Sequence, residues 1–217
     1  MSDKNYIPAL RFHWLTNSYD WIVSNLMPEK EFKNAVIHNA NIQTDFKVLD
    51  FGIGTATLSI MASLHQPKAT YIGIDVDNQV LEIANKKIIN SKSNIELLKY
   101  DGNKLPFSDN SFDRIITSLV IHHLTTDQKL VTFSEFKRVL KPNGEIHIAD
   151  WGKASNFLMK IMFNIVQFLD GYKTTNDNVK GKIPNILEQV GFNQIEIKQK
   201  FNTVLGTVEV FKIINNE

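Results

Sequence analysis

The sequence predicts one α/β domain built on a mostly parallel sheet of seven strands. Between residues 47 and 150, short apolar runs rich in β-branched residues alternate with longer amphipathic stretches, which is typical of repeated strand–helix–strand units. Near the end of the chain two more strand-like runs lie only a few residues apart, which indicates an antiparallel hairpin at the edge of the sheet. With 217 residues, of which 43% are hydrophobic, the chain can enclose such a core by itself.

Each element follows from its own run of residues. The parallel strands are expected at residues 47–51, 70–74, 94–99, 113–118 and 145–150, and the hairpin strands at 193–201 and 204–214. Helices are expected at residues 55–65, 78–91, 127–140 and 184–190. The proline and glycine within residues 141–144 are expected to end the third of these helices.

The single domain, residues 1–217, is expected to have four parts. Residues 1–45 form an N-terminal helical cap, which contains one or two helices over residues 9–41 and a new helix start at Pro28. The other parts are a cofactor-binding core at 46–151, a lid or insert at 152–183, and a C-terminal helix and hairpin at 184–217.

The lid segment is strongly apolar. Residues 157–169 are expected to form a helix on which only Lys160, Asn164 and Gln167 make a narrow polar stripe, so another surface must cover it. One lysine does not make the basic face of a membrane-surface anchor, which leaves a lid over an apolar or aromatic substrate, or the face of a homodimer. A polar loop that begins near Gly171 is expected to follow.

Composition excludes several classes of function. Lysine and arginine number 24 against 23 acidic residues, and only three are arginine, which argues against nucleic acid and for a small-molecule substrate. The absence of cysteine removes disulfides and thiolate chemistry, and the adjacent His122 and His123 lack the spacing of a metal site, so no metal is expected. Neither a secretory signal nor a membrane-spanning run is found, so a cytoplasmic protein is expected.

The strongest functional motif is VLDFGIGTA at residues 48–56, a strand that runs into a turn with two glycines and then a helix. Gly52 and Gly54 let a ligand approach the backbone closely, and the helix that follows directs free N–H groups at it. The turn predicts a nucleotide-type pocket. Any strand–helix turn can hold two glycines, so the prediction needs further residues.

Two further acids end the neighbouring strands. Asp75 follows Asp50 by 25 residues and can accept hydrogen bonds from both hydroxyls of a ribose, while Val76 beside it can pack on an adenine. Asp77 is the better candidate for capping the next helix. Asp101 ends the third strand, and because the carboxyl ends of parallel strands share one edge, the three acids are expected to converge on one crevice.

This crevice suits some cofactors better than others. Three carboxylates fit a ligand with hydroxyls, an exocyclic amine and a positive charge, and they fit phosphates badly. The turn of a dinucleotide fold needs glycine or alanine where this chain has Thr57, and no lysine of a nucleoside-triphosphate loop follows. NAD and nucleoside triphosphates are therefore disfavoured.

Four blocks stand in a fixed order: VLDFGIGTATL, IGIDVD, YDGNKLPFSDNSFDRIITSLVIHHL and RVLKPNGEIHIADW. They cover about residues 47–151, and as an ordered set they are far more specific than one glycine turn. On these blocks the chain resembles the class I S-adenosylmethionine-dependent methyltransferases, in the subfamily of the ubiquinone and menaquinone biosynthesis enzymes. The resemblance implies a Rossmann-like three-layer sandwich, S-adenosyl-L-methionine as cofactor, S-adenosyl-L-homocysteine as product, and methyl transfer to a small molecule.

The resemblance also implies which residues bind the cofactor. Asp50, Gly52 and Gly54 would line the methionine portion, and the backbone of Ser118 and Leu119 would border the methionine amino group. Asp75 would bind the ribose hydroxyls. The adenine would lie beside Val76, Asp101 and Gly102. Tyr19 is a further candidate for closing over the cofactor. The chain departs from the family at Ala56, where a third glycine is usual, and we expect a slightly tighter turn that still binds.

The implied reaction is in-line displacement of the methyl group, so the protein chiefly aligns the acceptor and excludes water, an effect worth about 7–11 kcal/mol. If the acceptor is a hydroxyl or a carbon acid, His123 or His122 can take its proton, although a space-filling role is favoured for His122. Asp150 and Trp151, at the end of the fifth strand, face the same crevice, and Asp150 either contacts substrate or forms a turn.

Two other functions remain open. A protein that binds the cofactor without catalysis, and uses the apolar helix as an interface, would show no turnover on a panel of acceptors. A nicotinamide-dependent oxidoreductase would prefer a different cofactor.

Overall fold

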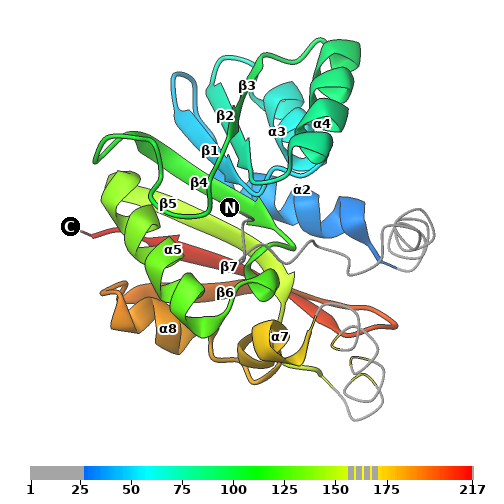
Figure 1. The fold of residues 1–217 in the computed structure, drawn as a ribbon, viewed down its shortest axis with the longest axis vertical. Helices are drawn as coiled ribbons and strands as arrows, with labels where there is room; N and C mark the ends of the chain where they lie inside the picture. Colours follow the sequence, from blue (N-terminus) through cyan, green and yellow to red (C-terminus); the bar gives the residue numbers. More distant parts are fainter. Residues whose placement is uncertain (1–26, 156–158, 160–162, 164–166, 168–170, 217) are drawn as a thin grey trace, which may run out of the picture.

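The computed structural model describes residues 27–155, 159, 163, 167 and 171–216, which form a three-layer α/β sandwich (Figure 1). Its sheet has seven strands in the order β3-β2-β1-β4-β5-β7-β6. The neighbours among β1 to β5 pair in parallel, whereas β7 is antiparallel to both β5 and β6. The predicted mostly parallel sheet with an antiparallel C-terminal pair is confirmed, and β7 lies inside the sheet while β6 forms its edge.

The strands lie close to their predicted positions. They are β1 (Lys47–Phe51), β2 (Thr70–Asp75), β3 (Ile95–Lys99), β4 (Phe112–Ser118), β5 (Leu140–Trp151), β6 (Gln194–Asn202) and β7 (Thr207–Ile214). Four of the five residues of β1 are buried, because this strand lies between β2 and β4 with helices on both of its faces.

Helices cover the two faces of the sheet. On one face, α2 (Glu29–Ala40), α3 (Thr57–His65) and α4 (Asn78–Ser91) contribute Val36, Ala62 and Ala84 to one apolar cluster. On the other face, α5 (Thr126–Val139) and α8 (Ile183–Gln189) contribute Phe133 and Leu187 to a second cluster. Figure 1 shows α5 and α8 as neighbours.

Two of these helices begin where the sequence provides a cap. Asp77 accepts hydrogen bonds from the backbone N–H groups of Gln79 and Val80 at the start of α4, as predicted. Thr125 and Gln128 form a reciprocal capping box at the start of α5. Both helices begin at the end of the sheet where the candidate site lies.

The predicted polar loop after Gly171 is wrong, because an eight-residue helix, α7 (Tyr172–Val179), lies there. Its sequence, YKTTNDNV, is poor in helix-favouring residues and has no apolar stripe, so no sequence signal indicates it. The buried side chains of α7 are polar, among them Thr174, Asp177 and Asn178. Hydrogen bonds to other parts of the fold compensate for the low helix propensity of these residues.

Helix α5 ends within one residue of its predicted end, but β5 begins five residues before its predicted start. The helix ends at Val139, and β5 begins directly at Leu140, so Pro142 and Gly144 lie within the strand. Backbone hydrogen bonds from Asn143 to Asn215 and from Asn215 to Gly144 hold this end of the strand against the end of β7. Pairing with a strand some 70 residues later therefore extends β5 back to the end of α5.

The cap and lid predictions fall partly outside the described residues. Helix α2 packs on the sheet itself, against β5 and β7, and Tyr19 lies in the segment 1–26, which is not described. Of the apolar helix, Met159, Phe163 and Gln167 are described, all in helical conformation, whereas Lys160 and Asn164 are not. The homodimer face and the division of the chain into four parts stay predictions.

Candidate active site

The turn after β1 is shaped by three residues with positive φ, namely Gly52 (+68°), Gly54 (+56°) and Ala56 (+64°). The two glycines differ in their surroundings. A Cβ on Gly52 would lie 2.6 Å from the side chain of Val120, so close packing requires this glycine. A Cβ on Gly54 would meet no atom closer than 4.0 Å, and therefore faces open space in which a ligand can lie.

The turn is tied to the end of β2. The backbone N–H of Gly54 donates to Oδ2 of Asp75 over 3.0 Å, and that of Asp77 donates to Oδ1 over 3.1 Å. The backbone N–H of Ile53 also donates to the carbonyl of Ile74. Asp75 is therefore less free than the sequence suggested, but each carboxylate oxygen keeps a lone pair for a ligand. Burial raises the pKa of Asp75 despite these hydrogen bonds.

The residues expected around an adenine are accessible. Val76 leaves 37% of its surface exposed, which is notable for an apolar residue at the end of a central strand. Asp101 and Gly102 are exposed, and a Cβ on Gly102 would meet nothing within 4 Å. The backbone N–H of Asn103 donates to Asp101 and lowers the pKa of its carboxyl group.

Asp50 lies deeper, with 2% of its surface exposed, and its Oδ2 accepts a hydrogen bond of 2.7 Å from the Ser59 hydroxyl on α3. Burial raises the pKa of Asp50 to about 7, although Ser59 and the positive charge of Lys33 act in the opposite direction. Asp75 also raises this pKa. Asp50 is in register with Gly73, two residues before Asp75, so these two acids stand near the same end of neighbouring strands. The convergence of all three acids on one crevice stays a prediction.

The end of β4 carries a strained residue and a free hydroxyl. Ser118 Oγ is buried and has no hydrogen-bond partner in the described part of the chain. Leu119 has φ +57°, a rare conformation for a residue with a Cβ, and its N–H donates to Ala149 on β5. Backbone strain of this kind collects at ligand sites.

Asp150 and His122 form a buried pair that the sequence interpretation missed. Oδ1 of Asp150 lies 2.7 Å from His122 Nδ1, and Oδ2 accepts from the His122 backbone N–H at 3.2 Å. The N–H of Trp151 donates to Oδ1 as well. Burial by itself would raise the pKa of Asp150, but the charge and the hydrogen bond of His122 lower it. The one signal in the sequence was that Asp150 ends one predicted strand and His122 follows the strand before it.

His123 stacks on this pair. The ring centroids of His122 and His123 lie 3.9 Å apart, and both residues belong to a short 3-10 helix, η2 (Ile121–His123). Burial and the neighbouring His122 lower the pKa of His123 to about 3. His123 is therefore neutral at physiological pH and can accept a hydrogen bond.

Aromatic side chains surround this end of β5. The ring of Trp151 lies 6.5 Å from that of His122 and 5.1 Å from that of Phe163. Phe163 belongs to the segment predicted to be an apolar lid. Cofactor-type features thus gather at the ends of β1, β2 and β3, and histidine and aromatic residues at the ends of β4 and β5.

Comparison with known proteins indicates the class of enzyme. A family model described as a methyltransferase domain matches residues 48–144. The ubiquinone/menaquinone biosynthesis C-methyltransferase UbiE of Blochmanniella floridana is 29% identical over 171 residues, which are 76% of this chain and 66% of that protein. The family model and this relative support the prediction that the chain is a class I S-adenosylmethionine-dependent methyltransferase resembling UbiE. The family model confirms the expected enzyme class, for which S-adenosyl-L-methionine is the expected cofactor.

Solved structures of similar fold agree. A S-adenosylmethionine-dependent methyltransferase from Aquifex aeolicus superimposes with a TM-score of 0.65 at 23% identity, over 90% of this methyltransferase and 97% of that chain. The phosphoethanolamine N-methyltransferase 2 of Haemonchus contortus, in complex with S-adenosyl-L-methionine, superimposes with a TM-score of 0.72 at 19% identity, over 93% and 56% of the two chains. At such identities the likeness concerns the fold.

The residues present fit the cofactor. Gly54 faces open space beside Asp75, Val76 is exposed next to it, and the Ser118 hydroxyl is buried without a partner in the described structure. A ligand with a ribose beside Asp75, a flat base on Val76 and an amino group near Ser118 would fill this space and give the Ser118 hydroxyl a partner.

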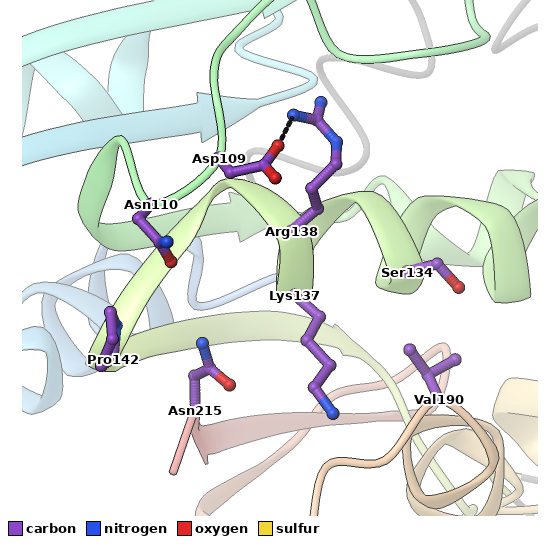
Figure 2. Close-up of a pocket in the computed structure, with 8 residues that line it drawn as sticks. All are labelled: Asp109, Asn110, Ser134, Lys137, Arg138, Pro142, Val190 and Asn215. Carbon is purple, nitrogen blue, oxygen red and sulfur yellow. Dashed lines mark hydrogen bonds and ion pairs between the residues drawn. The ribbon is translucent and has the colours of Figure 1, made fainter. Parts of the chain in front are cut away.

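A shallow pocket of about 450 Å³ lies at the opposite end of the sheet (Figure 2). It is lined by residues near the amino ends of β4 and β5, including Asn110 and Pro142, and by Lys137 of α5. Figure 2 shows the Lys137 side chain extending into it, while Arg138 is paired with Asp109. This pocket is remote from the glycine turn, and none of the cofactor-type residues lines it.

In the described segments, no helix is long and apolar enough to cross a membrane.

Proposed function

We propose that this methyltransferase transfers the methyl group to carbon of a small aromatic acceptor of the hydroquinone type. The observation that carries the proposal is the placement of a neutral histidine, His123, against His122, whose ring in turn lies beside Trp151 at the end of β5. The names of the UbiE relatives support the acceptor class and the acceptor atom.

We assign the cofactor to the ends of β1 to β4. In this proposal Asp75 binds the ribose hydroxyls, Val76, Asp101 and Gly102 border the adenine, and the other positions border the methionine portion, namely Asp50, Gly52, Gly54, Ser118 and Leu119. The contacts of Gly54 with Asp75 support the assignment, because they place the turn and the ribose-binding carboxylate together. When bound, the cofactor supplies a methyl group activated by the sulfonium.

The acceptor side has a different task. The ring carbon of a hydroquinone becomes more nucleophilic when its hydroxyl donates a hydrogen bond, and we propose that the neutral His123 accepts this hydrogen bond at a ring nitrogen. The ring carbon then takes the methyl group and releases its own proton to water, which restores the aromatic ring. Asp150 keeps the neighbouring His122 in one orientation and so limits the positions that His123 can adopt. Trp151 and Phe163 exclude water from the acceptor.

Calorimetric titration with S-adenosyl-L-methionine, S-adenosyl-L-homocysteine and NAD tests the cofactor site first. We expect both adenosyl ligands to bind without NAD, and Asp75→Ala to weaken them at least tenfold, since hydrogen bonds to a charged group contribute about 1.5–3 kcal/mol. Asp127→Asn, at an exposed position in the first turn of α5, is the matched control. Wild-type affinity in the Asp75→Ala variant would mean that the ribose lies elsewhere.

A panel of hydroquinones and phenols with isotopically labelled cofactor then tests the acceptor. A C-methylated product, identified by NMR, is expected for a hydroquinone. An O-methylated product, or no product from any hydroquinone in the presence of intact cofactor binding, would contradict the proposed acceptor. In the second case a panel of amines and small alcohols follows.

A further inference from the structure

Lys129 of α5 is a lysine without solvent exposure, and the cofactor site does not use it. Its ammonium group donates to the carbonyl of Leu124 over 2.8 Å and to the carbonyl of Thr174 over 2.7 Å. An ammonium group is costly to bury, so it is retained only with close partners. Leu124 directly follows η2, and Thr174 lies in α7, so this one side chain joins the two segments.

Asp177 of α7 completes the junction. Its Oδ2 lies 3.8 Å from Lys129 Nζ and accepts a 2.6 Å hydrogen bond from the Thr126 hydroxyl at the start of α5. Lys182 lies 3.8 Å from the other oxygen, at the surface. The buried charge of Lys129 therefore lies near the carboxylate of Asp177, and Thr126 and the exposed Lys182 hold that carboxylate in place.

A separate contact attaches α7 to β5. The Asn178 side-chain amide donates to the carbonyl of Trp151 over 3.0 Å. Helix α7 thus holds both segments on the acceptor side, namely η2 with its two histidines and the end of β5 with Asp150 and Trp151. In contrast, none of these hydrogen bonds involves the glycine turn or β2.

The charge of Lys129 also acts on the histidines. His123 is influenced by His122, Asp150 and Lys129, and the positive charge of Lys129 contributes to its low pKa, after burial and His122. Lys129 therefore affects the acceptor side both by hydrogen bonds and by charge.

We propose that Lys129 is a positioning residue for the acceptor side of the active site, where its ammonium group locks η2 against α7 and so fixes His123. The inference rests on the proposed function, because it assumes that His123 faces the acceptor. It requires that turnover depends on Lys129 while cofactor affinity does not.

Lys129→Met tests it, because methionine fills a similar volume without donors or charge. We expect kcat to fall at least tenfold while the Kd for S-adenosyl-L-methionine stays within twofold. In the complex with S-adenosyl-L-homocysteine, we expect the ¹⁵N resonances of the His122 and His123 rings to shift. Lys137→Met, on the same helix at the pocket of Figure 2, is the control and should change neither quantity.

A second pair of variants covers the case in which Lys129→Met does not fold. Thr126 is exposed, so Thr126→Val removes only the hydroxyl that holds Asp177, whereas Thr126→Ser keeps it. We expect Thr126→Val to shift the histidine resonances in the same direction by less, and Thr126→Ser to restore wild-type values. A loss of stability alone would not separate these two variants in this way.

Three outcomes would overturn the proposal: unchanged histidine resonances in Lys129→Met, turnover within twofold of wild type, or cofactor affinity that falls as much as kcat. The resonances need no acceptor. If no hydroquinone is methylated by the wild-type protein, the proposed function fails, and the histidine spectra still decide the role of Lys129.

Discussion

Asp150 binds His122 twice, because one carboxylate oxygen lies 2.7 Å from the imidazole Nδ1 and the other accepts from the backbone N–H at 3.2 Å. The two residues lie 28 positions apart in the chain and are 1% and 2% exposed. Their pairing joins the end of β5 to the segment after β4. Any change at one partner leaves the other buried without its counterpart.

Removing one partner of this pair should therefore destabilise the fold strongly. We expect Asp150→Ala to lower the free energy of unfolding by about 3–5 kcal/mol, the range for breaking a buried ion pair. Urea denaturation measures this loss. In a double-mutant cycle with His122→Phe, the effect of Asp150→Ala should become smaller by more than about 1 kcal/mol. Additive effects would show that the two side chains do not interact.

The two glycines of the turn should respond differently to alanine. Gly54→Ala places its Cβ in open space, so the unliganded protein should lose only about 1–2 kcal/mol, the cost of positive φ. Cofactor affinity should nevertheless fall at least tenfold. Gly52→Ala meets Val120 and should lose more stability. Thermal unfolding and calorimetry separate the two quantities, and equal cofactor affinity in Gly54→Ala and wild type would place the cofactor elsewhere.

Ala56 adopts φ +64° at the start of α3, and glycine should therefore be more stable there. We expect Ala56→Gly to raise the free energy of unfolding by about 1 kcal/mol, because relief of the left-handed strain exceeds the added chain entropy. Ala62→Gly, a buried position within the same helix, should have the opposite sign. A destabilised Ala56→Gly variant would show that the alanine is not strained.

Asp50 should make stability fall as pH rises. Its pKa is about 7 in the folded protein and 3.8 as a free side chain, so the folded state binds the proton more tightly. As pH rises from 4 to 7, the folded protein therefore loses the stability that it gains by binding this proton more tightly than the unfolded chain does. The loss is about 1.4 kcal/mol per pKa unit.

The Asp50→Asn variant isolates this effect, since the amide oxygen can still accept from Ser59. Relative to wild type, the variant should gain free energy of unfolding from pH 4 to pH 7 and reach a plateau above that. Chemical denaturation at several pH values measures the difference. A difference that does not change with pH would mean that Asp50 titrates normally.

The sequence by itself determined the strands and most of the helices, and it predicted the cofactor side of the site. Alternating apolar runs predict the strands because each must be buried between two layers of helices. The glycine turn and Asp75 could be recognised because their roles depend on backbone conformation and on position at the end of a strand. These signals come from residues that are close together in the chain, so they can be recognised without the tertiary structure.

The contacts that join the residues on the proposed acceptor side were decided only by the tertiary structure. Helix α7 consists of residues that favour loops, and it exists because buried partners such as Lys129 satisfy its polar groups. Lys129 and Thr174 are 45 positions apart, and Asp150 and His122 are 28 apart. A contact between such distant residues leaves no periodic pattern in the chain, because it depends on how the sheet and helices bring their ends together.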